Sequence, residues 1–256
     1  MTTTPRLHLD ALLAEGGAVT LDERHAHYLK NVLRRQAGDA VRLFNARDGE
    51  YAAVIGALTK KRAEARLHER LRAPEEEPDL WLLFAAVKRE AVDRIAEKAT
   101  ELGAASLRPV FTERTNAARV NEARLRLIAV EAAEQCGRLS VPEIARAEDL
   151  AAALAAWPQA RRLMFCDEAG DAPEEEWGGR EGRAAPALAA LAKAEPGPWA
   201  ILIGPEGGFS PAERARLRAL PFVTPVTLGP RILRADTAAL AALVLWQAAL
   251  GDFRRG

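Results

Sequence analysis

The sequence is poor in sulfur and in aromatic side chains, and it carries no excess of charge of either sign. Its two cysteines, Cys136 and Cys166, stand alone without a Cys-x-x-Cys spacing, which argues against a disulfide scaffold and against a zinc site. Lys plus Arg and Asp plus Glu balance at 36 each, so the global charge indicates no class of partner. Aromatic residues make up 5% of the chain while alanine is abundant, and this composition predicts numerous helices.

Long hydrophobic runs are also absent. The most apolar segment, TAALAALVLWQAAL at 237–250, is too short to span a bilayer and predicts a buried helix. The first residues, MTTTPRLHLDALLAEGG, lack the basic and apolar regions of a secretory signal. We therefore expect a soluble, cytoplasmic protein without a membrane partner. No metal site is expected either, because the histidines form no ligand cluster with Cys or carboxylates; they are His8, His25, His27 and His68.

The clearest boundary in the chain is LRAPEEEPDL at 71–80, where two prolines flank three glutamates and neither helix nor strand continues easily. We expect a small, mostly β domain over 1–72, folded as a compact barrel, then a linker over 73–79 and a larger domain over 80–256. The first 72 residues hold 13 basic and 9 acidic side chains. That excess suits a nucleic-acid-binding module, and it also suits an ordinary solvated surface.

Strand and helix signals differ on the two sides of this boundary. Before it, alternating residues predict strands on both sides of a turn at Asp48-Gly49 and again over 62–71, with one helix over 22–35 capped by Asp22. After it, apolar strands alternate with helices, which predicts a parallel sheet covered on both faces. The strands are expected at 80–87, 106–111, 161–168, 199–205 and 222–229. The helices are expected at 89–102, 121–135, 148–157, 185–194, 211–220 and 236–250. A polar, glycine-rich surface loop is expected over 170–186.

One expected strand runs into an unusual loop, WAILIGPEGGFSPAERARL at 199–217. Ser210, Pro211 and Glu213 occupy the N-cap, N1 and N3 positions of a capping box, so the start of the next helix is well specified. The glycines would let backbone groups approach a ligand closely. The loop lacks the Gly-Lys-Ser/Thr ending of a Walker A motif and is not a GxGxxG loop, so phosphate is not its obvious ligand. A purely structural turn remains the alternative.

The next strand ends in a second unusual stretch, TLGPRILRADTAAL at 227–240. Arg231 and Arg234 straddle the apolar pair Ile232-Leu233. If adjacent strands carry the two loops, both would meet at one edge of the sheet and form a pocket with backbone walls, an apolar floor and two cations. The alternative places the arginines on the surface and makes Ile232-Leu233 a helix-packing contact.

Together, IGPEGGFSPAE and LGPRILRADTA resemble the carboxyl-terminal signature of the SPOUT methyltransferases, and in particular the ribosomal RNA small subunit methyltransferase E family. The similarity continues through KATELGAASLRPVFTERT, EAAEQCGRLSVPEI and HYLKNVLRRQAGDAVRLFNARDGEY, so it covers nearly the whole chain in the expected order. Where we expect Thr and Glu in the family, this chain has Ala235 and Asp236.

The resemblance implies a PUA-like RNA-binding barrel over 1–72, followed by a SPOUT-type parallel-sheet α/β domain with a C-terminal deep trefoil knot. It implies methylation of N3 of a specific uridine in 16S rRNA with S-adenosylmethionine as donor. The implied partners are 16S rRNA, free or in the assembled small ribosomal subunit, and a second copy of the chain in a homodimer. The alternatives are a SPOUT relative that acts on tRNA or on a ribose 2′-hydroxyl, and a non-catalytic RNA-binding assembly factor.

The same resemblance implies the site residues. Cofactor contacts are expected at Phe165, Gly204, Glu206, Gly207, Leu228, Gly229, Ile232 and Leu233. Phe165 belongs to the strand expected over 161–168, whose end should form a third wall of the pocket. Arg231 or Arg234 would stabilise the anion that forms as N3 loses its proton, and Glu206 is a candidate proton acceptor. RNA contacts are expected at Lys30, Arg34, Arg35, Arg114 and Arg138. Cys166 is expected to be a buried small residue, because transfer from a sulfonium to nitrogen needs no covalent intermediate.

Overall fold

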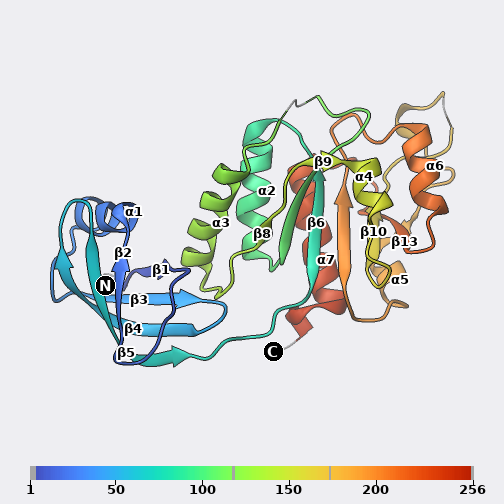
Figure 1. The fold of residues 1–256 in the computed structure, drawn as a ribbon. Helices are drawn as coiled ribbons and strands as arrows, with labels where there is room; N and C mark the ends of the chain where they lie inside the picture. The colour runs from blue at the N-terminus through green and yellow to red at the C-terminus, as the bar shows by residue number, and fades with distance from the viewer. Residues whose placement is uncertain (1–3, 117–118, 173, 255–256) are drawn as a thin grey trace. The chain divides into compact units, whose positions relative to one another are not determined.

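The computed structural model describes residues 4–116, 119–172 and 174–254, and the chain divides into two compact units (Figure 1). The first unit comprises residues 1–76 together with Val130–Val141, and the second comprises Glu77–Ala129 together with residues 142–256. The division at Glu76 falls inside the expected linker over 73–79. The predicted first domain did not include Val130–Val141, which comes from the middle of the chain.

The first unit is built on one sheet in the order β1-β3-β4-β5-β2, in which β1 pairs with β3 in parallel and all other pairs are antiparallel. The strands are β1 (Arg6–His8), β2 (Ala18–Leu21), β3 (Ala40–Asn45), β4 (Gly49–Leu58) and β5 (Ala63–Arg72). The expected turn at Asp48-Gly49 joins β3 to β4. Alternate residues of β5, including Ala63, Ala65 and Leu67, point into a buried apolar core. Among the described residues, no ladder joins β1 to β2, so the sheet that we expected to form a barrel has its ends at these two strands.

The helix expected over 22–35 begins as predicted but ends early. Asp22 caps α1 (Glu23–His27) by accepting a hydrogen bond of 2.9 Å from the His25 backbone N–H. The chain then forms the π-helix η1 (Tyr28–Val32), and Arg34 follows with a left-handed φ of 54°. A left-handed residue cannot continue a right-handed helix, so the regular structure stops before the predicted end.

The end of α3 (Glu122–Cys136) belongs to the first unit because Arg6 binds it there. The Arg6 guanidinium donates to the backbone carbonyls of Ala133 and Glu134 in the last turn of the helix, at 2.9 and 3.0 Å, and to the Arg138 carbonyl beyond its end at 3.2 Å. Its Nε donates to Glu50, whose side chain is 1% exposed. A charged residue on β1 therefore helps to hold Val130–Val141 in the first unit, together with a hydrogen bond of 2.6 Å from Arg72 to the Gly137 carbonyl and the packing of Ala133 and Leu139 on Phe44.

The second unit is built on a fully parallel sheet, as the alternation of strands and helices predicted. Its order is β11-β13-β10-β12-β6-β7-β8, with β9 paired to β7. The strands are β6 (Leu80–Ala85), β7 (Ser106–Phe111), β8 (Glu143–Ile144), β9 (Glu148–Asp149), β10 (Arg162–Cys166), β11 (Ala185–Pro186), β12 (Trp199–Ile203) and β13 (Val223–Thr227). Every residue of β12 is buried, which explains why its sequence is continuously apolar.

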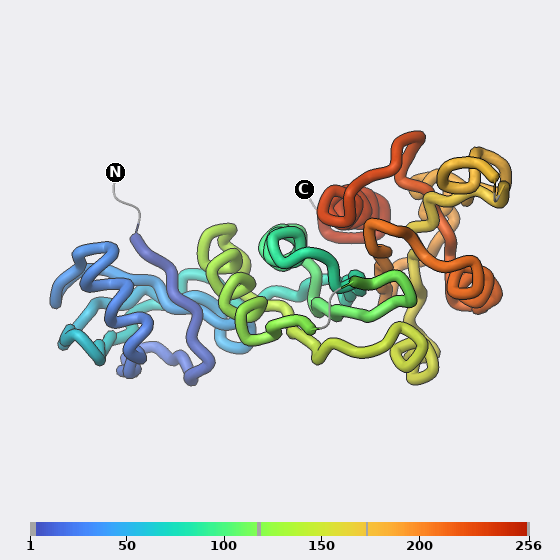
Figure 2. The backbone as a smooth tube through the Cα atoms, turned by 90° about the horizontal axis from the view of Figure 1, so that it is seen from above, coloured from blue at the N-terminus to red at the C-terminus, as the bar shows by residue number. Residues whose placement is uncertain are grey.

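Helices cover both faces of this sheet, and this confirms the second part of that prediction. Residues of α2 (Arg89–Glu101), α5 (Ala187–Leu191) and α7 (Ala235–Leu250) share one apolar core. Residues of α4 (Leu150–Ala155) and α6 (Pro211–Ala219) share the core on the other face, and Figure 2 shows α2 and α7 on the side opposite to α4 and α6. None of the helices in the described part of the chain is long and apolar enough to cross a membrane.

Candidate active site

The main pocket of the second unit has a volume of about 490 Å³ and lies where β10 and β12 end. Three chain segments supply most of its lining: residues 166–172 with Trp177-Gly178 at and after the end of β10, residues 203–209 at and after the end of β12, and Ile232-Leu233 before α7. The lining is completed by Arg114, Pro211, Arg214, Ala235 and Ala238. Because all of these strands are parallel, their carboxyl ends share one edge of the sheet, which is where open α/β folds bind ligands.

The strand order settles a condition that the sequence left open, namely whether adjacent strands carry the two loops. The two glycine-containing loops do not follow adjacent strands, because β10 lies between β12 and β13 and pairs with both. The segment after β10 therefore fills the space between the two predicted loops, and it supplies many of the residues that line the pocket. The pocket has three walls, of which the end of β10 is the third.

The glycines after β12 are needed for close packing and for backbone conformation. A Cβ on Gly204 would lie 2.6 Å from the Phe209 ring, so the ring can fold back over the strand end only because residue 204 has no side chain. Gly208 has a left-handed φ of 67°, and its N–H donates to the Pro205 carbonyl at 2.9 Å. After this turn α6 begins at the predicted capping box. The Ser210 N–H donates to the Glu213 carboxylate at 2.9 Å, and the Glu213 N–H donates to the Ser210 hydroxyl at 3.1 Å.

The segment after β10 is held by two arginines of α6. Arg214 Nε lies 2.8 and 3.0 Å from the two carboxylate oxygens of Asp167, which is 2% exposed, and Arg218 Nε donates to the same carboxylate at 2.6 Å. Arg214 also donates to the carbonyls of Ala169 and Gly170 at 2.6 and 2.9 Å. Its hydrogen bond to Asp171 lowers the pKa of that carboxyl below its ordinary value.

Glu168 connects the segment after β10 to the segment after β13. Its carboxylate accepts hydrogen bonds of 2.7 Å from the Thr227 hydroxyl and from the Leu228 backbone N–H. Burial raises the pKa of the Glu168 carboxyl, although these two hydrogen bonds lower it in part. The neighbouring Cys166 is buried, and burial raises the pKa of its thiol well above the ordinary value. A thiol in this state is not an activated nucleophile.

The structure brings five of the predicted cofactor residues together in the pocket lining; they are Gly204, Glu206, Gly207, Ile232 and Leu233. Phe165 is fully buried beneath the lining, with its ring edge-to-face against Phe209 at a centroid distance of 5.0 Å. Leu228 and Gly229 follow β13 outside the lining, beside the hydroxyl of Thr227.

The cations of the pocket are not the two arginines that the sequence pattern suggested. Arg231 and Arg234 are exposed and do not belong to the lining, whereas Arg114 and Arg214 do. Arg114, which was expected to face RNA, donates to the Gly207 carbonyl at 2.9 Å. The other expected RNA contacts belong to the first unit, where Lys30 and Arg34 are exposed, Arg35 is half-buried and Arg138 donates to Ser140 at 2.8 Å.

Sequence reasoning missed three residues of this site, namely Glu168, Trp177 and Arg214. Arg214 and Glu168 lie among many other charged residues, and nothing in their spacing distinguishes them. Trp177 offered a signal that could have been used, because it is the one aromatic residue in the polar loop over 170–186. Within the described part of the chain, no group of His, Cys, Asp or Glu side chains could hold a metal ion.

Two family models match the sequence along most of its length. The RNA methyltransferase domain matches residues 74–247, and the RNA methyltransferase PUA domain matches residues 21–67. Ribosomal RNA small subunit methyltransferase E from Rickettsia conorii is 32% identical over 93% of each chain, and the protein of the same name from Bacillus subtilis is 30% identical over 90% of each.

Two solved structures are similar over almost the whole chain. A putative methyltransferase from Legionella pneumophila, in complex with S-adenosylmethionine, has a TM-score of 0.82 and 29% identity. Ribosomal RNA small subunit methyltransferase E from Neisseria gonorrhoeae, bound to the same cofactor, has a TM-score of 0.80 and 28% identity. In both cases the similarity covers 98% of this chain and 100% of the other.

Proposed function

The chain belongs to the ribosomal RNA small subunit methyltransferase E family, and from that membership we propose that it methylates N3 of one uridine in 16S rRNA with S-adenosylmethionine as the methyl donor. The relatives' names supply the rRNA substrate class, and the two similar structures with bound cofactor supply the donor. The observation that carries the proposal is the pocket itself, which gathers the glycine loop after β12 and the Ile232-Leu233 pair at one sheet edge.

The residues present suit this cofactor. The pocket volume falls in the range of small-molecule sites, and its walls combine backbone groups of 204–208 with buried apolar side chains. Gly204, Glu206, Gly207, Ile232 and Leu233 would hold S-adenosylmethionine, with Phe165, Leu228 and Gly229 supporting those walls. When bound, it supplies a methyl group that its sulfonium has already activated. The remaining tasks, which are placement and electrostatics, fall to the chain.

The uridine N3 must lose its proton before its lone pair can attack. Glu206 is exposed at the opening of the pocket, and we propose it as the proton acceptor. The negative charge that develops on the uracil carbonyls needs a nearby cation. Arg231 and Arg234 remain proposed for that role from the family pattern, and Arg114 joins them because it lines the pocket.

Binding of the rRNA is proposed for the first unit, since the PUA domain model matches there. Lys30, Arg34, Arg35 and Arg138 would contact phosphates and position the RNA without reading its sequence. We also propose a homodimer, a cytoplasmic location and a trefoil knot in the last part of the chain. The knot, like the homodimer, is proposed from the resemblance to the SPOUT methyltransferases.

The proposal is tested by incubating the protein with labelled S-adenosylmethionine and small ribosomal subunits from a strain that lacks the modification. Naked 16S rRNA and tRNA serve as parallel substrates, and cofactor affinity is measured separately by calorimetry. Label in 16S rRNA supports the proposal, whereas label in tRNA alone contradicts the substrate assignment. Absence of cofactor binding would favour the non-catalytic RNA-binding factor. Single substitutions to Ala at Glu206, Arg114, Arg231 and Arg234 then assign the roles.

A further inference from the structure

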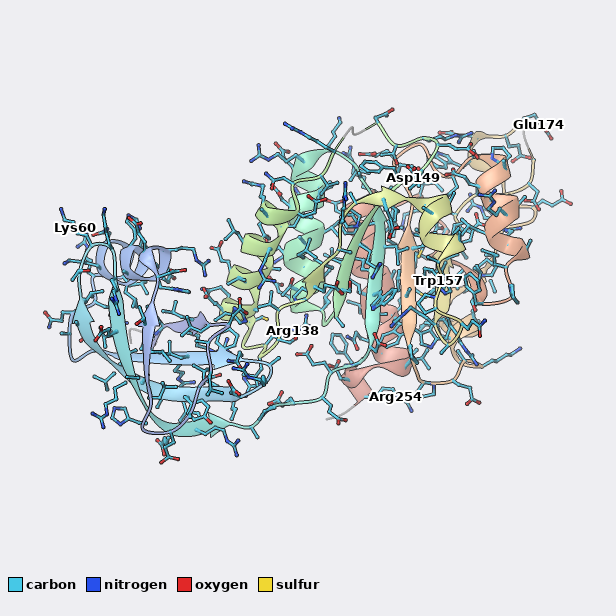
Figure 3. The ribbon with its side chains drawn as sticks, in the orientation of Figure 1. Lys60, Arg138, Asp149, Trp157, Glu174 and Arg254 are labelled. Carbon is cyan, nitrogen blue, oxygen red and sulfur yellow. The ribbon has the colours of Figure 1, made fainter. Side chains whose placement is uncertain are left out.

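The loop between β10 and β11 places a tryptophan at the pocket in a backbone conformation that tryptophan rarely adopts. Trp177, in the 3-10 turn η2 (Glu176–Gly178), has φ 54° and ψ 27°, which is the left-handed region. A bulky residue keeps such a conformation only where its surroundings impose it, and such residues cluster at binding sites. Figure 3 labels Glu174, which lies on this loop.

Backbone contacts fix the conformation of Trp177. Its carbonyl accepts a hydrogen bond of 2.8 Å from the Gly170 N–H, and Arg183 Nε donates to the Gly179 carbonyl at 2.8 Å. Arg214 in turn holds the Gly170 carbonyl at 2.9 Å. The loop is therefore tied to α6, and the indole is presented to the pocket by a fixed framework.

The indole lies directly over the glycine turn after β12. A Cβ on Gly208 would come within 3.1 Å of the Trp177 ring carbon Cζ3, so glycine at 208 makes room for the ring. A Cβ on the preceding Gly207 would meet the Arg114 side chain at 3.7 Å. The Trp177 ring therefore lies against Gly208, and the Arg114 side chain lies against Gly207.

Trp177, Arg114 and Gly207 are more exposed than the residues of the inner part of the pocket. The inner residues are apolar and at most 8% exposed; they are Cys166, Ile203, Ala235 and Ala238. Arg114 and Gly207 are exposed, and Trp177 is half-buried. A small cofactor can fill the inner part, but a base that remains attached to an RNA chain can enter only from the exposed side. Enzymes that modify a base hold it, once it is out of the stack, by stacking it on an aromatic ring.

From this geometry we propose that Trp177 is a positioning residue that stacks on the target uracil, with Arg114 beside it to receive the base's carbonyl or its phosphate. This inference rests on the proposed function, since it names how that site receives its substrate. The proposal assigns recognition of the base to the polar loop over 170–186, in which the sequence analysis predicted no site residue.

The test compares Trp177→Phe, Trp177→Leu and Trp177→Ala with the wild type. Glu176→Ala is the matched control, because Glu176 is the exposed neighbour on the same loop and does not line the pocket. Two quantities are measured for each: the dissociation constant of S-adenosylmethionine by calorimetry, and kcat/KM for methylation of small ribosomal subunits. We expect the Leu and Ala variants to lose about 5- to 150-fold in kcat/KM, which corresponds to one base–aromatic stack. The Phe variant should retain most activity, and cofactor affinity should stay within about twofold in every variant.

Several outcomes would overturn the assignment. A large loss of cofactor affinity in Trp177→Ala would place the ring against the adenine of the donor instead of the target base. Full activity in Trp177→Leu would show that bulk suffices without an aromatic face, and an equal loss in Glu176→Ala would assign the effect to the loop as a whole. Absence of methyl transfer by the wild type, a separate observation, would refute the proposed function and this inference with it.

Discussion

Arg214 on α6 and Asp167 at the end of β10 form a buried ion pair in which Nε contacts both carboxylate oxygens, at 2.8 and 3.0 Å. The pair joins α6, which follows the loop after β12, to the segment after β10, and both that loop and that segment line the pocket. Both side chains are shielded from water, with exposures of 13% and 2%, so the interaction is only weakly screened.

Replacing Arg214 with Ala should loosen the segment over 167–182. We expect a loss of about 2 kcal/mol in the free energy of unfolding, because the Asp167 carboxylate loses one charged hydrogen-bond donor while Arg218 still pairs with it. Cofactor affinity should fall at the same time, since Ala169 and Gly170 lose their donor. Chemical denaturation and calorimetry measure the two effects. Arg216→Ala is the control, because Arg216 is an exposed arginine on the same helix, and it should change neither the free energy of unfolding nor the cofactor affinity. If Arg214→Ala also left both quantities unchanged, the role of this ion pair would be contradicted.

Glu168 should give the stability a pH dependence of definite sign. Its pKa is raised in the folded chain, so the folded state holds the proton more tightly than the unfolded state. The contribution of this group to stability is therefore greatest at low pH and falls as pH rises through the folded pKa. Glu168→Gln cannot titrate, so the stability of wild type relative to the variant should decline as the pH rises from below the ordinary carboxyl pKa through the raised pKa of Glu168. Urea unfolding at a series of pH values measures the difference, and a rise over that range would contradict the assignment.

Arg6 should determine whether Val130–Val141 stays in the first unit. Arg6→Ala removes the donor to three carbonyls and one of the arginines that contact the buried Glu50. We expect the free energy of unfolding to fall by about 3 kcal/mol. Hydrogen exchange of the amides over 130–141 should accelerate. Lys60→Ala, an exposed residue of the hairpin between β4 and β5 that is labelled in Figure 3, is the control. Unchanged protection over 130–141 in Arg6→Ala would show that the remaining contacts, which are the hydrogen bonds of His8 and Arg72 and the packing on Phe44, hold the segment without Arg6.

The two thiols should react very differently. Cys136 is exposed, whereas Cys166 is buried and its pKa is raised well above the ordinary value. At neutral pH a thiol reagent should therefore label Cys136 rapidly in the native protein and Cys166 only after denaturation. Mass spectrometry of labelled peptides distinguishes the two. Rapid native labelling of Cys166 would indicate that the pocket wall opens readily.

Local signals predicted the elements of the fold well. The apolar runs at 199–205 and 161–168 became β12 and β10, and the Ser210–Glu213 capping box starts α6 as expected. The order of strands could not be predicted, because most of the parallel strands are joined to the next through a helix and the apolar pattern of a strand does not show which strands lie beside it. For that reason the sequence left open whether adjacent strands carry the two glycine loops, and the structure places β10 between those strands.

The site was predictable in its backbone and much less so in its side chains. The local sequence was enough to predict a loop of exposed backbone after β12, because an apolar strand runs there into three glycines and a helix cap. The arrangement of Trp177 depends on hydrogen bonds between residues of a loop without periodicity, and the arrangement of Arg214 depends on which loop lies over α6. Val130–Val141 was likewise missed, because α3 is a single uninterrupted helix in the sequence and its end joins the first unit through contacts that are distant in the chain, those of Arg6 and Arg72 among them.

The most direct test of the central claim is the identity of the methylated nucleoside. Small ribosomal subunits from a strain without the modification are treated with the protein and labelled S-adenosylmethionine, the rRNA is digested to nucleosides, and the label is identified and mapped. Our account predicts 3-methyluridine at a single position in 16S rRNA. Label on a ribose 2′-hydroxyl, label on another base, or no transfer by a protein that binds the cofactor would contradict it.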